Sequence, residues 1–128
     1  MGWKRPKPLV WVASSKADLK AFPSEVQDLM GYALHQAQEG SKHAATKPLR
    51  GFGGAGVLEV VEDHDGSTYR AIYTVKFAGV VYVLYAFQKK AKKGIATPKQ
   101  EIDLLRARLR QAEEHYRREY AKTKSKGG

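Results

Sequence analysis

Three segments with the composition of β-strands follow one another between residues 57 and 88. They read VLEVVED (57–63), TYRAIYTVKF (68–77) and VVYVLYAFQ (80–88). The turn-rich stretch DHDGS leads into the second segment, and Ala78-Gly79 predicts a tight hairpin turn before the third. Two consecutive hairpins make an antiparallel meander. Because the third segment is nearly all apolar, we expect it to be central and covered on both faces.

One short strand and two helices are predicted before the meander. PLVWVA (8–13) predicts a first strand, and Ser15-Lys16-Ala17-Asp18 is typical of a helix start with a hydroxyl cap, for a short helix to about Phe22. A second helix is predicted from Pro23 to a stop at Gly40. Its apolar residues recur on one face: Val26, Leu29, Met30, Ala33, Leu34 and Ala37. Residues 41–56 are expected to be a connection.

The last predicted helix has a full start signal. Thr97 can cap it, Pro98 suits its first position and Gln100 completes a capping box. An apolar stripe follows: Ile102, Leu105, Leu109, Ala112 and Tyr116. The order β-α-α-β-β-β-α predicts an α+β fold, one small domain over residues 1–128 with helices against an antiparallel sheet and a frayed tail from about residue 122.

Charge is distributed unevenly along the chain. The net charge is +10, of which residues 1–88 contribute 10 Lys+Arg against 8 Asp+Glu (+2), and residues 89–128 contribute 13 against 5 (+8). Such asymmetry favours a polyanionic partner, namely nucleic acid, an anionic membrane or an acidic protein, although a solvated basic helix and tail would have the same composition.

Several classes of protein are disfavoured. The chain has no cysteine, and no apolar run reaches the roughly 18–20 residues of a spanning helix. The apolar run near the N-terminus is too short for a signal peptide, so we expect a cytoplasmic protein without membrane association. The GxGxxG pattern at 51–56 precedes a strand instead of a helix, and the four histidines lack ligand spacing, so no cofactor or metal is expected.

Arg70 and a lysine cluster are the best candidates for chemistry. Arg70 lies inside the predicted strand 68–77, where folding does not need a guanidinium, and its fork suits a phosphate. The hairpin at Ala78-Gly79 places Arg70 opposite about Phe87. The third strand ends there and runs into four lysines: Lys89, Lys90, Lys92 and Lys93. We therefore predict one phosphate pocket at this end of the sheet.

Such a pocket could cut RNA. A 2′-hydroxyl can attack its adjacent phosphate if one group takes its proton, another protonates the leaving oxygen and cations stabilise the phosphorane. Lysines packed beside other cations have lowered pKa values and can serve as base or acid. Non-catalytic binding of nucleic acid would place the same residues in the same pattern.

The segment YRAIYTVKFAGVVYVLYAFQKKAKKGIATPKQEIDLLRARL resembles the HigB-like, phage-derived branch of the RelE/ParE toxin superfamily, and KPLRGFGGAGVLEVVEDHDG before it fits the same pattern. The resemblance covers roughly residues 9–112, and FQKKxKKGIxTP is its most specific part. It implies a small antiparallel sheet flanked by helices and the role of toxin in a type II toxin–antitoxin pair. It also implies cleavage of mRNA on the ribosome and a helix-turn-helix antitoxin as partner.

The resemblance also implies roles for individual residues. Arg70 matches a catalytic, phosphate-contacting arginine, and the lysines after the last strand fall where RelE-type toxins carry basic active-site residues. The strand 57–63 lacks the lysines that those toxins use, and their C-terminal tyrosine has no clear match, so Glu59 or His64 could take over acid–base work. The predicted catalytic set is Arg70, Lys89, Lys90, Glu59 and His64, and the predicted RNA or ribosome contacts are Arg50, Lys92, Lys93, Lys99, Arg106 and Arg110.

The function expected from sequence is therefore a ribosome-dependent, metal-independent mRNA endonuclease that inhibits translation, with ribosome, mRNA and antitoxin as partners. Two alternatives stay open. ParE relatives share the fold and block DNA gyrase without catalysis, and a plain nucleic-acid-binding module would carry the same basic residues.

Overall fold

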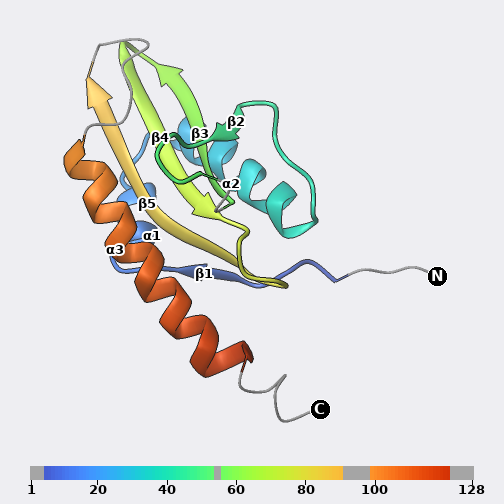
Figure 1. Ribbon diagram of the computed structural model, residues 1–128. Coiled ribbons are helices and arrows are strands. Elements are labelled where there is room, and N and C mark those ends of the chain that lie inside the picture. Colours follow the sequence, from blue (N-terminus) through green and yellow to red (C-terminus); the bar gives the residue numbers. More distant parts are fainter. Residues whose placement is uncertain (1–4, 54–55, 91–98, 122–128) are drawn as a thin grey trace.

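The computed structural model describes residues 5–53, 56–90 and 99–121, which form one β-sheet with helices on both faces (Figure 1). Along the chain the elements are β1 (Leu9–Trp11), α1 (Ser15–Lys20), α2 (Ser24–Gln38), β2 (Thr46–Pro48), β3 (Val57–His64), β4 (Ser67–Thr74), β5 (Val81–Lys90), α3 (Lys99–Tyr116) and the π-helical turn η1 (Arg117–Ala121). The predicted α+β class is confirmed. None of the helices in these ranges is long and apolar enough to cross a bilayer.

The strand order is β1-β5-β4-β3-β2. The predicted antiparallel meander is confirmed as β3-β4-β5. The prediction of a wholly antiparallel sheet is wrong, because β1 pairs parallel to β5. The apolar strand β5 is consequently second from the edge, and β4 is central. Pairing direction for a three-residue strand depends on tertiary packing, which local sequence does not encode.

The short strand β2 lies where a connection was expected. It pairs antiparallel to β3, with Lys47 opposite Glu59. Three residues carry no period-2 signal, and Pro48 argues against a strand except at an edge, which is where β2 lies. As a result β3 is an interior strand along its first half.

The β3–β4 hairpin is tighter than DHDGS suggests. Asp65 and Gly66 have φ values of 51° and 79°, the two positive values of a type I′ turn. His64 pairs with Ser67, so His64 belongs to β3 and not to the turn. At the other hairpin, the Val80 amide donates to the Phe77 carbonyl at 3.3 Å, so a turn lies at Ala78-Gly79 as predicted. The connection is longer than the predicted tight turn, because β4 ends at Thr74 and β5 begins at Val81.

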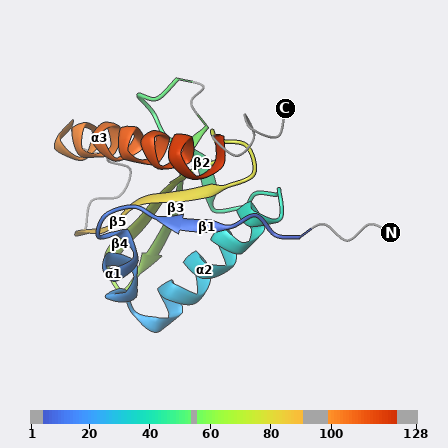
Figure 2. The ribbon, with the colours of Figure 1, turned by 90° about the horizontal axis from the view of Figure 1, so that it is seen from below.

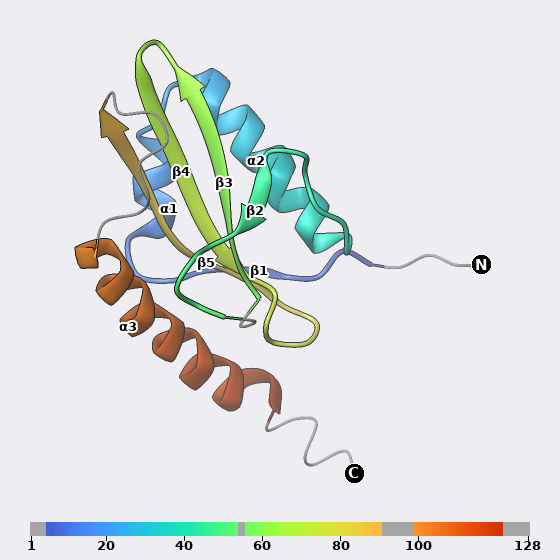
Figure 3. The same cartoon turned by 45° about the horizontal axis from the view of Figure 1, so that its top comes forward.

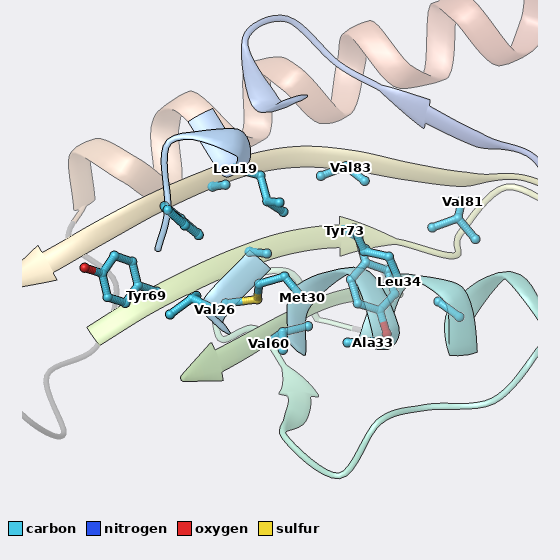
Figure 4. Packing of buried hydrophobic residues seen from close by; sticks show 14 residues of the cluster. Leu19, Val26, Met30, Ala33, Leu34, Val60, Tyr69, Tyr73, Val81 and Val83 are labelled. Carbon is cyan, nitrogen blue, oxygen red and sulfur yellow. The ribbon is translucent and has the colours of Figure 1, made fainter. Parts of the chain in front are cut away.

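Helices α1 and α2 cover one face of the sheet (Figure 2). The apolar stripe of α2 packs on the strands, as predicted, and Figure 4 shows Met30 and Leu34 of this helix against the sheet residues Val60 and Tyr73. Gly40, with φ of 89°, follows the end of the helix. The members of this cluster on α2 are Val26, Met30, Ala33, Leu34 and Ala37, with Leu29 at its edge.

The start of α1 is shifted by one residue from the prediction. Ser14 stands at the cap position, and its hydroxyl donates to the Asp18 carboxylate at 2.8 Å. Ser15 is instead fully buried and donates to the Val83 carbonyl at 3.1 Å. The second serine thus ties α1 to β5.

Helix α3 covers the opposite face (Figure 2). All five residues of the predicted stripe belong to the core on this face, and Leu105 and Ala112 are fully buried. The predicted capping residues Thr97 and Pro98 and the tail 122–128 lie outside the described residues. In Figure 3 the turn between β3 and β4 extends well beyond the start of α3, so this helix does not run along the whole face.

Candidate functional site

A row of side chains crosses the α3-facing side of the sheet. Lys47 pairs with Glu59 across β2 and β3, and Arg70 pairs with Phe87 across β4 and β5. Directly opposed residues share a face, and Glu59 is the diagonal neighbour of Arg70 through the Val61–Arg70 pairing. The predicted register, with Arg70 opposite Phe87, is confirmed.

Arg70 and Glu59 form a buried ion pair. The Arg70 Nη1 atom lies 2.8 Å from Glu59 Oε2, and the side chains are 7% and 6% exposed. Lys47 Nζ approaches the other carboxylate oxygen at 3.9 Å from an exposed position. A buried carboxylate is costly unless it is paired and hydrogen-bonded, so the two cations explain why Glu59 is tolerated here. The strand β2 covers this edge of β3, so Glu59 is buried.

His64 lies on the other face of the sheet from Arg70. Because side chains alternate between the two faces along β3, His64 and Glu59 point to opposite faces. The His64 ring packs edge-on against Tyr69, with 6.4 Å between ring centroids. Its Nε2 atom is 3.5 Å from Glu25 of α2. The structure therefore does not bring His64 together with the other predicted catalytic residues.

The lysine cluster begins beside Arg70. Lys89 is half-buried and stands opposite Thr68, so it shares the face of Arg70 and lies one step closer to the end of the sheet. Thr68 in turn donates to Asp63 at 2.8 Å. The backbone of Lys90 pairs with Ser67. Lys92 and Lys93 lie outside the described residues.

An aromatic pair on β5 was not singled out from the sequence. A β-bulge at Leu84 turns Tyr85 to the α3-facing side, opposite Ile72, and Phe87 follows on the same side. Their rings stack with centroids 5.0 Å apart and planes 24° apart. Burial, and then the nearby Glu101 carboxylate, raises the pKa of Tyr85, so its hydroxyl stays protonated at neutral pH. A strict period-2 count misses this pair because the bulge shifts the alternation.

Arg108 of α3 completes this group. Its guanidinium lies over the Tyr85 ring, 4.9 Å from the centroid, and donates to the Leu84 carbonyl at 3.0 Å and the Ser14 hydroxyl at 3.3 Å. Leu84 is the residue that the bulge leaves out of the ladder, so Arg108 supplies its carbonyl with a donor.

The scan against protein-family models matches residues 17–110 to the family "Phage derived protein Gp49-like". The match covers more than half of the 128 residues. This chain belongs to the Gp49-like family. Among solved structures, one similar chain comes from the toxin–antitoxin complex RelBE2 of Mycobacterium tuberculosis, with 20% identity, a TM-score of 0.43 and coverage of 66% of this chain and 100% of that one. No curated protein matched the sequence.

The remaining predicted contacts of this Gp49-like protein are spread over its α3 side. Arg106 donates to the Gly51 carbonyl at 3.0 Å and lies over the Phe52 ring, so it holds the connection before β3 against α3. Lys99 lies 3.7 Å from Asp103, and both are exposed. Arg50 and Arg110 are exposed as well.

Helix α3 and η1 are less basic than the prediction of a basic last helix assumed. Residues 99–121 hold six Lys+Arg and five Asp+Glu, for a formal charge of +1. The excess of residues 89–128 therefore falls on four lysines at 89–93 and three at 122–126. The Gp49-like chain thus carries its strongest positive charge at the end of the strand that holds Tyr85 and Phe87 and immediately after it.

Charged and planar groups lie together on this face, namely Arg70 with its partner Glu59, Lys89, and the stacked rings of Tyr85 and Phe87. Arginine forks suit phosphate oxygens, and the paired carboxylate holds Arg70 in one orientation. Within the described part of the chain, no three His, Asp or Glu side chains are grouped so that they could hold a metal ion.

Proposed function

We propose that this Gp49-like protein is the toxin of a type II toxin–antitoxin pair and cleaves mRNA on translating ribosomes. Membership of a phage-derived family agrees with the resemblance to the HigB-like branch of the RelE/ParE superfamily. The observation that carries the proposal is the convergence of Arg70 and Lys89 on one face at one end of the sheet. A cognate helix-turn-helix antitoxin is the protein partner that the resemblance implies.

In this proposal the attacking group is the 2′-hydroxyl of the mRNA itself. Arg70 stabilises the charge that develops on the phosphorane, and Glu59 holds the guanidinium in place. Lys89, which shares the face of Arg70, protonates the leaving oxygen, and a lysine of the segment that follows it takes the proton of the attacking hydroxyl. Because Glu59 is buried and paired with Arg70, we assign it to positioning, and we leave His64 out because it lies on the opposite face.

The test is cleavage of a defined mRNA in a translation extract, with and without ribosomes, with 5′ ends mapped by primer extension. We expect cuts that need ribosomes. Arg70→Lys should lower the cleavage rate by about 100-fold, because a lysine keeps the charge beside Glu59 but loses the fork. Lys89→Gln should lower it as well.

Lys20→Gln is the matched control, since Lys20 is exposed on α1 across the sheet from Arg70. It should cut like the wild-type protein. Intact mRNA with the wild-type protein would contradict the proposal, and inhibition of DNA gyrase supercoiling would then be the next measurement.

A further inference from the structure

Phe87 belongs to a column of stacked groups. Along β5, the Arg108 guanidinium lies toward Leu84, the Tyr85 ring follows, and the Phe87 ring stacks next to it. The Leu84 carbonyl and the Ser14 hydroxyl fix the guanidinium at one end of this column. Phe87 is therefore the last ring of the column.

The Phe87 end of the column lies in the most cationic part of the site. Arg70 is directly opposite Phe87, and Lys89 is two residues further along the same face. The sequence adds Lys90, Lys92 and Lys93 immediately afterwards. Both rings are only partly buried, in contrast to Tyr73 and Tyr82 on the same sheet, which are 0% exposed.

Rings next to cations are the combination that single-stranded nucleic acid requires. Its backbone is bound by charge, and its unpaired bases stack on aromatic side chains and on arginine planes. An apolar peptide would find rings here, but it would have no use for the cations. An acidic peptide could use the cations but would not need the stacked rings. The combination of rings and cations therefore favours single-stranded RNA over a protein segment as the occupant of this surface.

We propose that the Arg108–Tyr85–Phe87 column is a base-stacking site, on which an unpaired nucleobase of the RNA stacks against Phe87 next to the phosphate held at Arg70 and Lys89. The inference rests on the proposed function for its ligand, single-stranded RNA. Because every base has a π face, the site orders the strand without demanding one sequence. Arg108 acts as a positioning residue, since it holds Tyr85 and the bulged strand in place.

The test uses the full-length protein and a short 2′-O-methyl oligoribonucleotide of mixed sequence that contains 2-aminopurine. Such an oligonucleotide cannot be cut by 2′-hydroxyl attack, so binding is measured apart from cleavage. Stacking quenches 2-aminopurine fluorescence, and anisotropy gives the Kd. We expect quenching with the wild-type protein and weaker quenching of the same strand in a duplex, where the base is already paired.

Phe87→Leu keeps the apolar volume but removes the ring. We expect it to weaken binding by about 5- to 150-fold and to remove the quenching, the range found when stacking rings are lost. Phe87→Trp keeps a ring and should retain both signals. Lys20→Gln, across the sheet, should bind like the wild-type protein. Thermal unfolding of each variant checks that the fold persists.

Unchanged affinity and quenching in folded Phe87→Leu would overturn the base-stacking site. So would unchanged RNA binding combined with a weaker complex with the cognate antitoxin, because the column would then be a protein contact. The proposed function fails separately: quenching that depends on Phe87, without any cleavage of mRNA on ribosomes, would keep the site and remove the nuclease. Cleavage of mRNA on ribosomes that is unchanged in Phe87→Leu would keep the nuclease and remove the base-stacking site.

Discussion

Because Arg70 is paired with Glu59, its proposed role in cleavage has to be separated from its role in folding. The Arg70 side chain is 7% exposed and paired with a Glu59 carboxylate that is 6% exposed, so it is part of the core as well as of the proposed pocket, in contrast to the expectation that folding does not need a guanidinium there. Removing one partner leaves a buried charge without its counter-charge. Loss of cleavage in Arg70→Ala would therefore not separate chemistry from folding, which is why Arg70→Lys is the more informative variant.

We expect Arg70→Ala and Glu59→Ala each to lower the free energy of unfolding by about 3–5 kcal/mol. The double variant should lose clearly less than the sum, because it leaves no unpaired charge behind. Urea unfolding monitored by circular dichroism measures all three. Strictly additive losses would show that the two side chains do not stabilise one another.

The position of Arg70 could be predicted from the sequence, whereas other features of the site could not. Counting residues through the Ala78-Gly79 turn places Arg70 opposite Phe87 and near the lysines, and this pairing is observed. Next to the turn the ladder is offset by one residue from that count, with Thr74 opposite Tyr82, and the bulge at Leu84 restores the counted register. The burial of Glu59 could not be predicted, because it depends on the three-residue strand β2. The stacking of Tyr85 on Phe87 depends on a bulge that no local signal marks.

At the scale of elements, helix α3 is fastened to the sheet by polar contacts as well as by its apolar stripe. The Tyr82 hydroxyl and His115 Nδ1 lie 2.8 Å apart, and the Tyr116 hydroxyl donates to the Ala78 carbonyl at 2.9 Å. Amphipathic periodicity predicted the stripe, since it is a local property of the chain. The partners of the polar contacts come from distant segments, so sequence periodicity could not identify them.

Burial of Tyr82 should make stability depend on pH in the alkaline range. Burial, and then the neighbouring Tyr120 and Tyr116, raise the pKa of Tyr82 from 10.0 to about 12. The folded state therefore holds this proton more tightly than the unfolded state. The contribution is fully present below pH 10 and is lost as the pH rises from 10 toward 12.

Chemical unfolding at pH 8, 10 and 11 should show this decline, and Tyr82→Phe should flatten it. The decline should not vanish in that variant, because burial also raises the pKa values of Tyr73 and Tyr85. An equally steep decline in Tyr82→Phe would show that Tyr82 does not contribute.

The entry into β3 depends on a glycine. Gly56 has φ of 66°, and its carbonyl accepts from the Val75 amide and the Thr74 hydroxyl, each at 3.0 Å. A Cβ atom would lie 3.2 Å from the Lys76 backbone nitrogen. We expect Gly56→Ala to destabilise the protein by about 1–2 kcal/mol from the left-handed conformation alone.

The matched control is Gly53→Ala, because Gly53 lies in the same connection, lacks a positive φ and has nothing within 4 Å of the Cβ atom that an alanine would add. Thermal unfolding of both variants decides the point. Equal melting temperatures would contradict the role assigned to Gly56.

At the scale of the whole molecule, the charge lies in two short stretches rather than along the last helix. Residues 99–121 contribute only +1 of the +10, whereas four lysines lie at 89–93, at the end of β5 and just after it, and three lie at 122–126. The asymmetry of the chain was readable from composition, but its position relative to the sheet was not. The first stretch begins beside Arg70, so we propose that it belongs to the RNA site proposed above, and that the second stretch attracts RNA without being part of that site.

Deletion of residues 122–128 should leave cleavage sites unchanged but reduce the salt dependence of RNA binding. With three fewer lysines, the negative slope of log K against log salt should become less steep by about 2 for a single strand. Anisotropy titrations at salt concentrations from about 50 to about 200 mM measure this slope. An unchanged slope would mean that these lysines do not contact RNA.

The central claim, that the Arg70 and Lys89 end of the sheet cuts mRNA by attack of its own 2′-hydroxyl, is tested most directly by the chemistry of the cut ends. An mRNA cut on ribosomes by the wild-type protein should leave a 2′,3′-cyclic phosphate on the upstream fragment. A single 2′-deoxynucleotide on the 5′ side of the mapped cut should abolish cleavage there. A free 3′-hydroxyl, or cleavage that persists past the deoxynucleotide, would contradict the mechanism.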